Sequence, residues 1–576
     1  MRISSVRILA FAFLAVWQPS LPAQTLPSPH WWQGAVIYEI YPRSFQDSNG
    51  DGIGDLNGIT SRLSYLQNLG VDAIWITPMF PSPLVDFGYD VSNYEGIAPE
   101  YGTLEDFDRL LSQAHQHHIR VIIDMVLNHT SDQHPWFVEA SKSINNARHD
   151  WYVWNSGKLE PDRRRVPPNH WKSYFGESSW QWVPSVSQFY YHAYYKEQPD
   201  LNWRNPAVEQ AMFAVMRFWL DRGVDGFRLD SIPDLFEDKR LRDDPPGKGL
   251  DELGQPRVDR IYTSNRPEIH EVMRRMRAMV SSYPGDRVLI GETDLPNTRE
   301  LDKWYGGTRH DELQLPMDTL VGFVDKLDAG QFRQRLTETN TQIHGSEPLL
   351  FFDCHDADRS WDRYGDGTHN DLIAKLIATL LLTSRATVLL YQGEELGQIT
   401  SKPTNFLDVK DPVGKAFWPR YVGRDGERTP MQWDLSNAQA GFSSNPKTWL
   451  PVSRNYDTVN VKTELESSDS LLNWHKRLMA FRRKYGPLRN GAVVMFDTNN
   501  PDVLSYARTA SDGETVVISM NMSATPKSVS LDNERLASGV DRHVVTLLQS
   551  GANTRYSPVT HDVLLSPFAS WIGVLH

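Results

Sequence analysis

The sequence predicts an α/β fold, a (β/α)8 TIM barrel with a subdomain inserted after strand 3 and an antiparallel β domain at the C-terminal end. Three observations predict it: eight short apolar runs, helical patterns between most of them, and a tail of short β-branched segments. Runs that are apolar on both faces are typical of parallel strands covered by helices, and eight such strands alternating with helices indicate this barrel.

The predicted strands are spread over the first two thirds of the chain. They are Ala35–Tyr41, Asp72–Pro78, Arg120–Val126, Gly226–Ser231, Arg287–Thr293, Glu312–Asp318, Pro348–Cys354 and Ala386–Gln392. The clearest helix is Pro206–Arg222, where apolar residues recur along one stripe. Further helical patterns cover Thr103–His118, Pro267–Tyr283, Asp328–Ile343 and Asp371–Ser384.

The gap between the third and fourth predicted strands is the widest, and it is rich in Trp, Tyr, Pro and Ser. We predict an inserted subdomain over residues 129–201, with the barrel formed by residues 24–128 and 202–488. After a helix at Leu471–Tyr485, β-branched segments alternate with turn residues at Val493–Phe496, Thr515–Met520 and Val544–Leu548. This alternation predicts a β-sandwich domain over residues 489–576.

Residues 1–23 are predicted to form a signal peptide. Arg2 and Arg7 precede the apolar run Ile8–Trp17, and Ala23 offers a small residue before the cut. The run is too short to span a membrane, and no later run is long enough. We therefore expect a protein exported to the periplasm or the extracellular space, without a membrane anchor after cleavage.

The composition narrows the classes of function. The net charge is -13 and no long basic run offsets it, which argues against nucleic acid as a partner. The chain has one cysteine, Cys354, so no intramolecular disulfide can form. The 19 Trp residues suit stacking against sugar rings, although most of them also suit a hydrophobic core.

Polar residues end four of the predicted strands. In a barrel of this kind, strand ends on the C-terminal face meet at one mouth, so these residues are the candidates for catalysis. A single buried acid is more often part of a structural ion pair, whereas four such strand ends together favour an active site. The residues concerned are Asp124, Asn128 and His129 at the end of the third strand, Arg228 and Asp230 on the fourth, Glu292 at the end of the fifth, and His355 and Asp356 at the end of the seventh.

The fourth and fifth strands carry two carboxyl groups, Asp230 and Glu292, that would have to be in opposite protonation states. Arg228 and Asp230 project to the same face of their strand, so the guanidinium favours an ionised Asp230, as a nucleophile requires. Glu292 needs a proton to donate, and burial beside the negative Asp230 is predicted to raise its pKa. The alternative is that Arg228 and Asp230 form only a buried ion pair.

These residues resemble the α-amylase superfamily, and its oligo-1,6-glucosidase and α-glucosidase branch in particular. The resemblance extends from about Trp31 to the tail, and its motifs are specific as a set. They are Asp-Met-Val-Leu-Asn-His at 124–129, Gly-Phe-Arg-Leu-Asp at 226–230, Gly-Glu-Thr at 291–293 and His-Asp at 355–356. Gln-Pro-Asp-Leu-Asn at 198–202, Gly-Glu-Glu-Leu-Gly at 393–397 and Arg-Thr-Pro-Met-Gln-Trp at 428–433 also resemble this branch.

The resemblance implies catalytic roles for matching positions. Asp230 would attack the anomeric carbon and Glu292 would protonate the leaving group, in a retaining reaction through a covalent glucosyl-enzyme intermediate. Asp356 would hold sugar hydroxyls and favour ring distortion. His129 and His355 would donate hydrogen bonds that strengthen in the transition state.

The resemblance also implies a closed pocket for one terminal sugar. Tyr89 would stack on the first glucose ring, and Asp86 would pair with Arg428 to grip its non-reducing end. Phe175 is expected to line the pocket, and Arg228 to contribute to substrate binding. Such a pocket implies exo action on small oligosaccharides, and no organic cofactor is expected.

Two positions depart from the family pattern. Cys354 stands where the family usually has Asn before the His-Asp pair, which changes the support of His355 without removing a catalytic group. Ser231 follows the nucleophile, where the family has Val with α-1,6 preference and Thr or Ala with α-1,4 preference. Because Ser is small and polar, α-1,4 substrates such as maltose are the prediction.

A loop after the first strand carries oxygen side chains at alternate positions with glycines between them. Such a loop can wrap a hard cation, although a metal-free Asp/Gly turn would look the same. The family resemblance points to a structural Ca2+ site. Its ligands would be Asp47, Asn49, Asp51, the backbone oxygen of Ile53, and Asp55.

Several functions remain open beside hydrolysis of maltose. An oligo-1,6-glucosidase, or a transglycosylase or isomerase such as a trehalose synthase, would use the same catalytic residues. The Arg-Leu-Asp-Arg-Asp loop of sucrose isomerases is missing from the sequence. A non-catalytic relative of amino-acid transporter heavy chains is disfavoured, because those proteins carry a membrane helix and lose the acid pair.

Overall fold

The computed structural model describes residues 30–531, 536, 543–551, 558–559 and 562–576. The predicted signal peptide lies outside these residues. Among the described residues, no helix is long and apolar enough to cross a bilayer.

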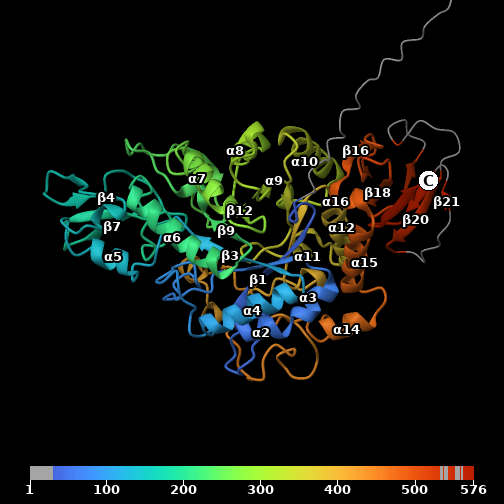
Figure 1. Cartoon of the computed structure of the whole chain (residues 1–576), viewed down its shortest axis with the longest axis horizontal. Coiled ribbons are helices and arrows are strands. Elements are labelled where there is room, and N and C mark those ends of the chain that lie inside the picture. Colours follow the sequence, from blue (N-terminus) through green and yellow to red (C-terminus); the bar gives the residue numbers. More distant parts are fainter. Residues whose placement is uncertain (1–29, 532–535, 537–542, 552–557, 560–561) are drawn as a thin grey trace, which may run out of the picture. The chain divides into compact units, whose positions relative to one another are not determined.

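Eight parallel strands form one sheet in the order β13-β12-β9-β3-β2-β1-β15-β14. Figure 1 labels β1, β3, β9 and β12 of this sheet. Each of the eight predicted strands is present, and most are shorter than predicted. They are β1 Val36–Ile40, β2 Ala73–Ile76, β3 Arg120–Val126, β9 Gly226–Asp230, β12 Val288–Gly291, β13 Leu315–Pro316, β14 Leu349–Leu350 and β15 Thr387–Tyr391. An isolated parallel bridge between Met317 and Leu349 joins the two edge strands and closes the barrel.

The edge strands β13 and β14 are the shortest in the barrel. Proline lacks the N–H that a ladder needs, and it occurs within β13 as Pro316 and directly before β14 as Pro348. The other six strands are buried almost throughout, which explains why their sequences are apolar on both faces.

The predicted long helices surround the barrel sheet. They are α4 Leu104–Gln116, α6 Pro206–Arg222, α7 Ile269–Ser281, α10 Ala329–Gln342, α12 Asn370–Thr383 and α15 Leu471–Lys484. Shorter helices are α1 Pro42–Phe45, α2 Leu56–Ser61, α3 Leu63–Leu69, α5 Pro135–Ala140, α8 Thr298–Trp304, α9 Thr319–Gly322, α11 Ser360–Tyr364, α13 Pro412–Phe417, α14 Val461–Glu466 and α16 Gly486–Asn490.

Local sequence signals set the ends of the clearest helix, α6. The Asn205 side chain accepts from the backbone N–H of Ala207, and Pro206 occupies the first helical turn. Gly223 ends the helix in the left-handed conformation with φ of 105°. The buried stripe of α6 includes Met212, Met216 and Trp219.

The segment between β3 and α6 forms a small β structure with its own apolar cluster. A three-stranded sheet has the order β4-β8-β7, from Trp154–Asn155, Gln188–Tyr191 and Trp180–Val183. A second pair joins β5 Lys158–Leu159 to β6 Arg165–Val166. The cluster is Trp171, Trp180, Phe189, Tyr191 and Ala193. The backbone bridge between His129 and Asp200 ties both ends of the segment to the barrel mouth.

The C-terminal antiparallel β domain is present. Its main sheet has the order β16-β17-β18-β23-β20-β21, and β19 pairs with β22. The strands are β16 Ala492–Phe496, β17 Val503–Thr509, β18 Thr515–Asn521, β19 Lys527–Ser530, β20 Val544–Gln549, β21 Pro558–Val559, β22 Asp562–Leu565 and β23 Ser570–Leu575. The hairpin of β10 Pro246–Leu250 and β11 Pro256–Val258 follows β9 in the chain.

One buried arginine, Arg508, joins this sheet to the barrel, and a second, Arg482, joins α15 to the barrel. Arg508 of β17 donates to the carbonyl oxygens of Thr383 (2.8 Å) and Leu488 (3.1 Å). Arg482 of α15 donates to the carbonyls of Gly34 (2.9 Å) and Leu382 (2.8 Å). Burial lowers the pKa of Arg482 to about 10 and that of Arg508 to about 9.

Candidate active site

The carboxyl ends of the barrel strands open into a cavity of about 200 Å³. The third, fourth, fifth and seventh strands all deliver polar residues to this end of the barrel, as predicted. The cavity is lined by Asp86, Tyr89, His129, Tyr174, Phe175, Tyr194, Asp230, Ser231, Pro233, Asp234, Ser264, Glu292, Asp294, Asp356 and Arg424. Arg228, His355 and Arg428 lie behind this lining.

Arg228 holds three carboxyl groups at once. Its Nη1 lies 2.7 Å from Asp230 Oδ1 and 3.1 Å from Asp124 Oδ1, and its Nη2 lies 2.9 Å from Glu292 Oε1. Since both nitrogens belong to one planar guanidinium, the Asp230 and Glu292 oxygens can be at most about 8 Å apart. This limit admits the separation of about 5 Å found in retaining glycosidases.

The two candidate catalytic carboxyls are ionised over different pH ranges. Burial raises the pKa of Asp230 to about 6, against the lowering effect of Arg228. Burial also raises the pKa of Glu292 to about 7, with Arg228 opposing and Asp230 adding to the rise. The predicted rise for Glu292 is confirmed. For Asp230 we expected Arg228 to dominate, and burial outweighs it.

Asp356 is held by cations on two sides. Arg428 Nη2 donates to its Oδ1 at 2.6 Å and Arg424 Nη1 at 3.1 Å, and His355 Nε2 lies 3.1 Å from its Oδ2. Burial alone would raise the pKa of Asp356, but His355, Arg424 and Arg428 outweigh it and lower the pKa well below its usual value. Asp356 is therefore an anion throughout the neutral range.

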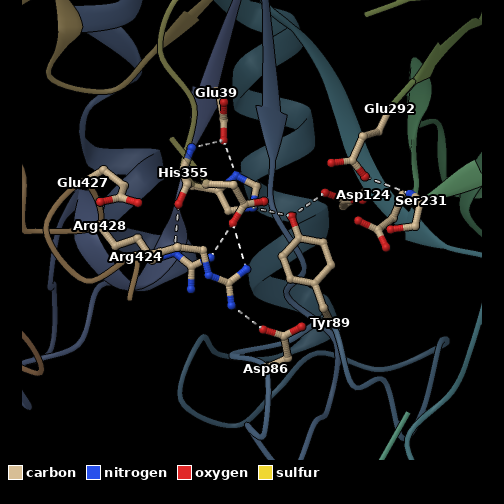
Figure 2. A network of polar contacts seen from close by, with 12 residues as sticks. Glu39, Asp86, Tyr89, Asp124, Ser231, Glu292, His355, Arg424, Glu427 and Arg428 are labelled. Atoms are coloured by element: carbon tan, nitrogen blue, oxygen red, sulfur yellow. Dashed lines mark hydrogen bonds and ion pairs between the residues drawn. The ribbon is translucent and has the colours of Figure 1, made fainter. Parts of the chain in front are cut away.

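His355 links the cavity wall to Glu39, near the carboxyl end of β1 (Figure 2). Its Nδ1 lies 2.5 Å from Glu39 Oε1, and its Nε2 lies 2.8 Å from the Tyr89 hydroxyl. Burial alone would lower the pKa of His355. Asp356 and Glu39 outweigh this effect and raise the pKa to about 9, so the ring is cationic at neutral pH. The Tyr89 ring stacks on the His355 ring with centroids 5.5 Å apart.

Sequence reasoning missed Glu39, which lies on β1 and is fully buried. An acid inside an otherwise apolar strand, Val36–Ile40, is the signal that could have identified it. Its role follows from the contact with His355 Nδ1, which fixes the orientation of the imidazole ring.

The predicted pairing of Asp86 with Arg428 is wrong. Asp86 Oδ1 accepts from Arg424 Nη2 at 2.9 Å (Figure 2). Arg424 Nε also contacts Asp411 Oδ2 at 2.9 Å. Arg428 is buried behind the wall, where its Nε donates to the carbonyl oxygen of His355 at 2.9 Å. Both arginines lie in one loop, four residues apart, and only the backbone path decides which one faces the cavity.

His129 and Phe175 line the cavity as predicted. His129 Nε2 lies 3.0 Å from the Gln198 side-chain nitrogen and 3.2 Å from the Tyr89 carbonyl oxygen. Burial lowers the pKa of His129 to about 3, so it is neutral. Phe175 packs on Tyr195, with ring centroids 4.2 Å apart.

The predicted calcium loop folds into a series of tight turns. Asp47 accepts from the backbone of Gly50 (2.7 Å) and Gly52 (2.8 Å), and Asn49 accepts from Asp51 N–H (2.9 Å). Asp55 caps α2 through the N–H of Gly58 at 2.7 Å. Within the described residues, no three His, Cys, Asp or Glu side chains are grouped as a metal cluster. Calcium binding therefore stays a prediction.

Cys354 is a buried free thiol next to His355. Burial raises the pKa of its thiol well above the usual value, so it is not a thiolate nucleophile. Its backbone forms an isolated bridge with Ala357, which fixes the turn that carries His355 and Asp356.

Known proteins resemble this chain over most of its length. It is 43% identical over 525 residues to a probable alpha-glucosidase of Rhizobium meliloti, covering 88% of this chain and 92% of that protein. It is 36% identical over 526 residues to an oligo-1,6-glucosidase of Parageobacillus thermoglucosidasius, covering 86% and 91%. Maltase 1 of Drosophila virilis is 37% identical over 544 residues, covering 91% and 84%.

Solved structures share the fold. The trehalulose synthase MutB from Pseudomonas mesoacidophila MX-45 superposes with a TM-score of 0.86 at 32% identity, covering 96% of this chain and 100% of that one. The alpha-glucosyl transfer enzyme XgtA gives 0.85 at 36% identity, covering 95% and 100%. The model of the alpha-amylase catalytic domain matches residues 39–491. With these likenesses over nearly its whole length, the chain belongs to the alpha-amylase family of glycoside hydrolases.

Proposed function

We propose that the chain is a secreted, retaining exo-α-glucosidase that releases terminal α-linked glucose, mainly α-1,4-linked, from maltose and short oligosaccharides. One observation carries the proposal: a single guanidinium, Arg228, holds Asp230 and Glu292 at the wall of one cavity, with Asp86 and Arg424 paired in the same wall. The ion pair of Asp86 and Arg424 would close the end of the cavity that holds the non-reducing end of the substrate, so that one terminal sugar fits. The maltase and alpha-glucosidase relatives support this substrate class.

In the first half of the reaction, an ionised Asp230 oxygen forms a bond to the anomeric carbon. The glycosidic C–O bond breaks, and its electron pair leaves with the oxygen, which takes the proton of Glu292. In the second half, Glu292 removes a proton from water, whose oxygen attacks the anomeric carbon and releases Asp230. Asp356 and Tyr89 would hold and stack the sugar ring.

An isomerase or transglycosylase is the second candidate, because several structural neighbours are named trehalulose synthase. A sugar hydroxyl in place of water in the second half of the reaction would give such a product. Maltose, isomaltose, sucrose, trehalose and maltotriose should be incubated with the protein, and the products identified over time. Glucose as the sole early product of maltose supports hydrolysis, and faster release from maltose than from isomaltose supports the α-1,4 preference. Trehalose or trehalulose as a main product would replace the proposal with the second candidate.

The proposed roles predict a narrow bell-shaped dependence of kcat/KM on pH. Asp230 must be ionised, so activity falls as the pH drops through its pKa of about 6. Glu292 must be protonated, so activity also falls as the pH rises through its pKa of about 7. Because the two groups interact, the limbs report apparent values of the pair. Initial rates on maltose at pH values from about 4 to about 9 test this, and a flat alkaline side would contradict the role of Glu292.

We also propose that the loop from Asp47 to Asp55 binds a structural Ca2+. Its donors would be three carboxylates, the Asn49 amide oxygen and the Ile53 carbonyl oxygen, which suit a hard cation. Removing the ion with EDTA should lower Tm, and Ca2+ should restore it more fully than Mg2+. A ligand present at about 100 times its Kd contributes about 2.7 kcal/mol to stability. Asp51→Ala should abolish the response to EDTA, and an unchanged Tm in the unaltered protein would exclude the site.

Export is a further part of this proposal and rests on residues 1–23, which lie outside the described part of the chain. The mature protein should begin close to residue 24. Mass spectrometry of protein recovered outside the cytoplasm tests this, and an intact N-terminus in that fraction would contradict it.

A further inference from the structure

Ser231 connects the two candidate catalytic carboxyls. It directly follows Asp230, and its backbone N–H donates to Glu292 Oε2 at 2.8 Å (Figure 2). Its φ of 46° lies in the left-handed region, which is unfavourable for serine. Because this conformation is strained for serine, contacts with neighbouring residues must stabilise it. The same contacts then help to set the orientation of the Asp230–Ser231 peptide plane and its N–H.

The Tyr194 hydroxyl is the group that holds Ser231. Its oxygen lies 2.8 Å from Ser231 Oγ and 2.8 Å from Asp234 Oδ2. A phenol has one proton, so the hydroxyl donates to the carboxylate and accepts from the Ser231 hydroxyl. The backbone N–H of Asp234 donates to the Ser231 carbonyl oxygen at 3.1 Å. One phenol thus fixes both ends of the turn from Ser231 to Asp234.

Tyr194 is itself held in place from behind. Its ring stacks on Tyr174 with centroids 5.0 Å apart and planes at 14°. Arg260 lies 3.8 Å over the Tyr174 ring, and the Tyr174 hydroxyl donates to the other oxygen of Asp234 at 3.1 Å. Tyr194 belongs to the segment between β3 and α6, so that segment reaches the turn beside Glu292.

We infer that Tyr194 is a positioning residue for Glu292, acting through the backbone of Ser231. The inference deepens the proposed function and rests on Glu292 being the acid/base. Tyr194 touches the turn rather than the reacting atoms in this arrangement, and its hydroxyl sets the direction of the Ser231 N–H. That N–H favours the ionised form of Glu292 and therefore lowers its pKa against the effect of burial.

Tyr194→Phe removes the hydroxyl and keeps the ring. With the N–H loosened, the alkaline limb of kcat/KM should move upward by about half a pH unit. The rate on maltose should fall about tenfold, because its poor leaving group depends on an aimed proton donor. Nitrophenyl α-glucoside needs little protonation of its leaving group, so its rate should change far less.

Introducing Tyr194→Phe into a Ser231→Gly protein tests whether Tyr194 acts through Ser231. Glycine adopts positive φ without strain, so the N–H keeps its direction without help from Tyr194. Tyr194→Phe should therefore shift the alkaline limb in the Ser231 protein and leave it in place in the Ser231→Gly protein. Tyr190→Phe is the matched control: Tyr190 is a buried tyrosine of the same segment that lies outside the cavity lining, its hydroxyl donates to the carbonyl oxygen of Lys196, and its loss should not move the limb.

The outcomes separate the inference from the proposed function. If Glu292→Gln leaves the alkaline limb unchanged, the acid/base assignment fails. If Glu292→Gln abolishes the limb but Tyr194→Phe does not shift it, the inference alone fails. An equal effect of Tyr194→Phe in both backgrounds would also overturn it, because the hydroxyl would then act on the substrate directly. Thermal melts of each variant check that the fold is retained.

Discussion

Asp230→Asn should reduce kcat on maltose and on nitrophenyl α-glucoside by a factor on the order of 10⁴ to 10⁶, the scale expected when a nucleophile is lost. The amide keeps the shape of the carboxyl and an oxygen that can accept from Arg228 Nη1, which lies 2.7 Å from Asp230 Oδ1. What it removes is the anionic oxygen that bonds to the anomeric carbon. Both substrates lose activity together, because both need this bond.

Asp124→Asn is the matched control for this variant. Asp124 bonds the same Arg228 nitrogen at 3.1 Å, is buried, and lies outside the cavity lining. Its loss should cost far less activity, through the altered charge around Arg228. Single-turnover rates of the purified variants, with melts to confirm folding, provide the measurement. Turnover of the Asp230 variant within tenfold of the unaltered protein would reject its role as nucleophile.

Glu292→Gln should lower kcat/KM on maltose by about 10² to 10⁴, the range that a positioned proton donor contributes. The amide oxygen can still accept from the Ser231 N–H, whereas the NH2 group that replaces Oε1 cannot accept from Arg228, so the variant keeps the side-chain shape and loses the ion pair. Nitrophenyl α-glucoside should lose much less in its first step, because nitrophenolate leaves without a proton. The alkaline limb of the pH profile should disappear, since no group then titrates as the acid.

Asp294→Asn serves as the control for Glu292→Gln. Asp294 lies two residues further along and lines the same cavity, and burial raises its pKa as well. If Asp294 were the proton donor, its variant would lose the alkaline limb and the Glu292 variant would keep it. Rates of both variants on the two substrates across the pH range distinguish these assignments.

The barrel and the positions of its site residues could be predicted because one physical rule governs both. Strands covered by helices must be apolar on both faces, so polar residues such as Asp230 and Glu292 mark the strand ends. The same rule did not locate β17, since Val503–Thr509 includes Arg508, a charged residue whose burial depends on carbonyls from distant parts of the chain.

The finer electrostatics of the site could not be predicted from the sequence. Whether Asp86 faces Arg424 or Arg428 depends on the path of a loop without regular structure. The pKa of Asp230 depends on the balance between burial and the charge of Arg228. The sequence shows that Arg228 is near Asp230, but it does not show how deeply Asp230 is buried. The conformation of Ser231 depends on Tyr194, which is far away in the chain.

The buried Arg508 between the barrel and the C-terminal sheet has a consequence for any attempt to shorten this protein. Removing the chain after α16 would take Arg508 away and leave the carbonyl oxygens of Thr383 and Leu488 without that donor. The surfaces that α10, α12 and α16 pack against strands of this sheet would meet water. The barrel and the C-terminal sheet should therefore unfold together, in one cooperative thermal transition rather than two.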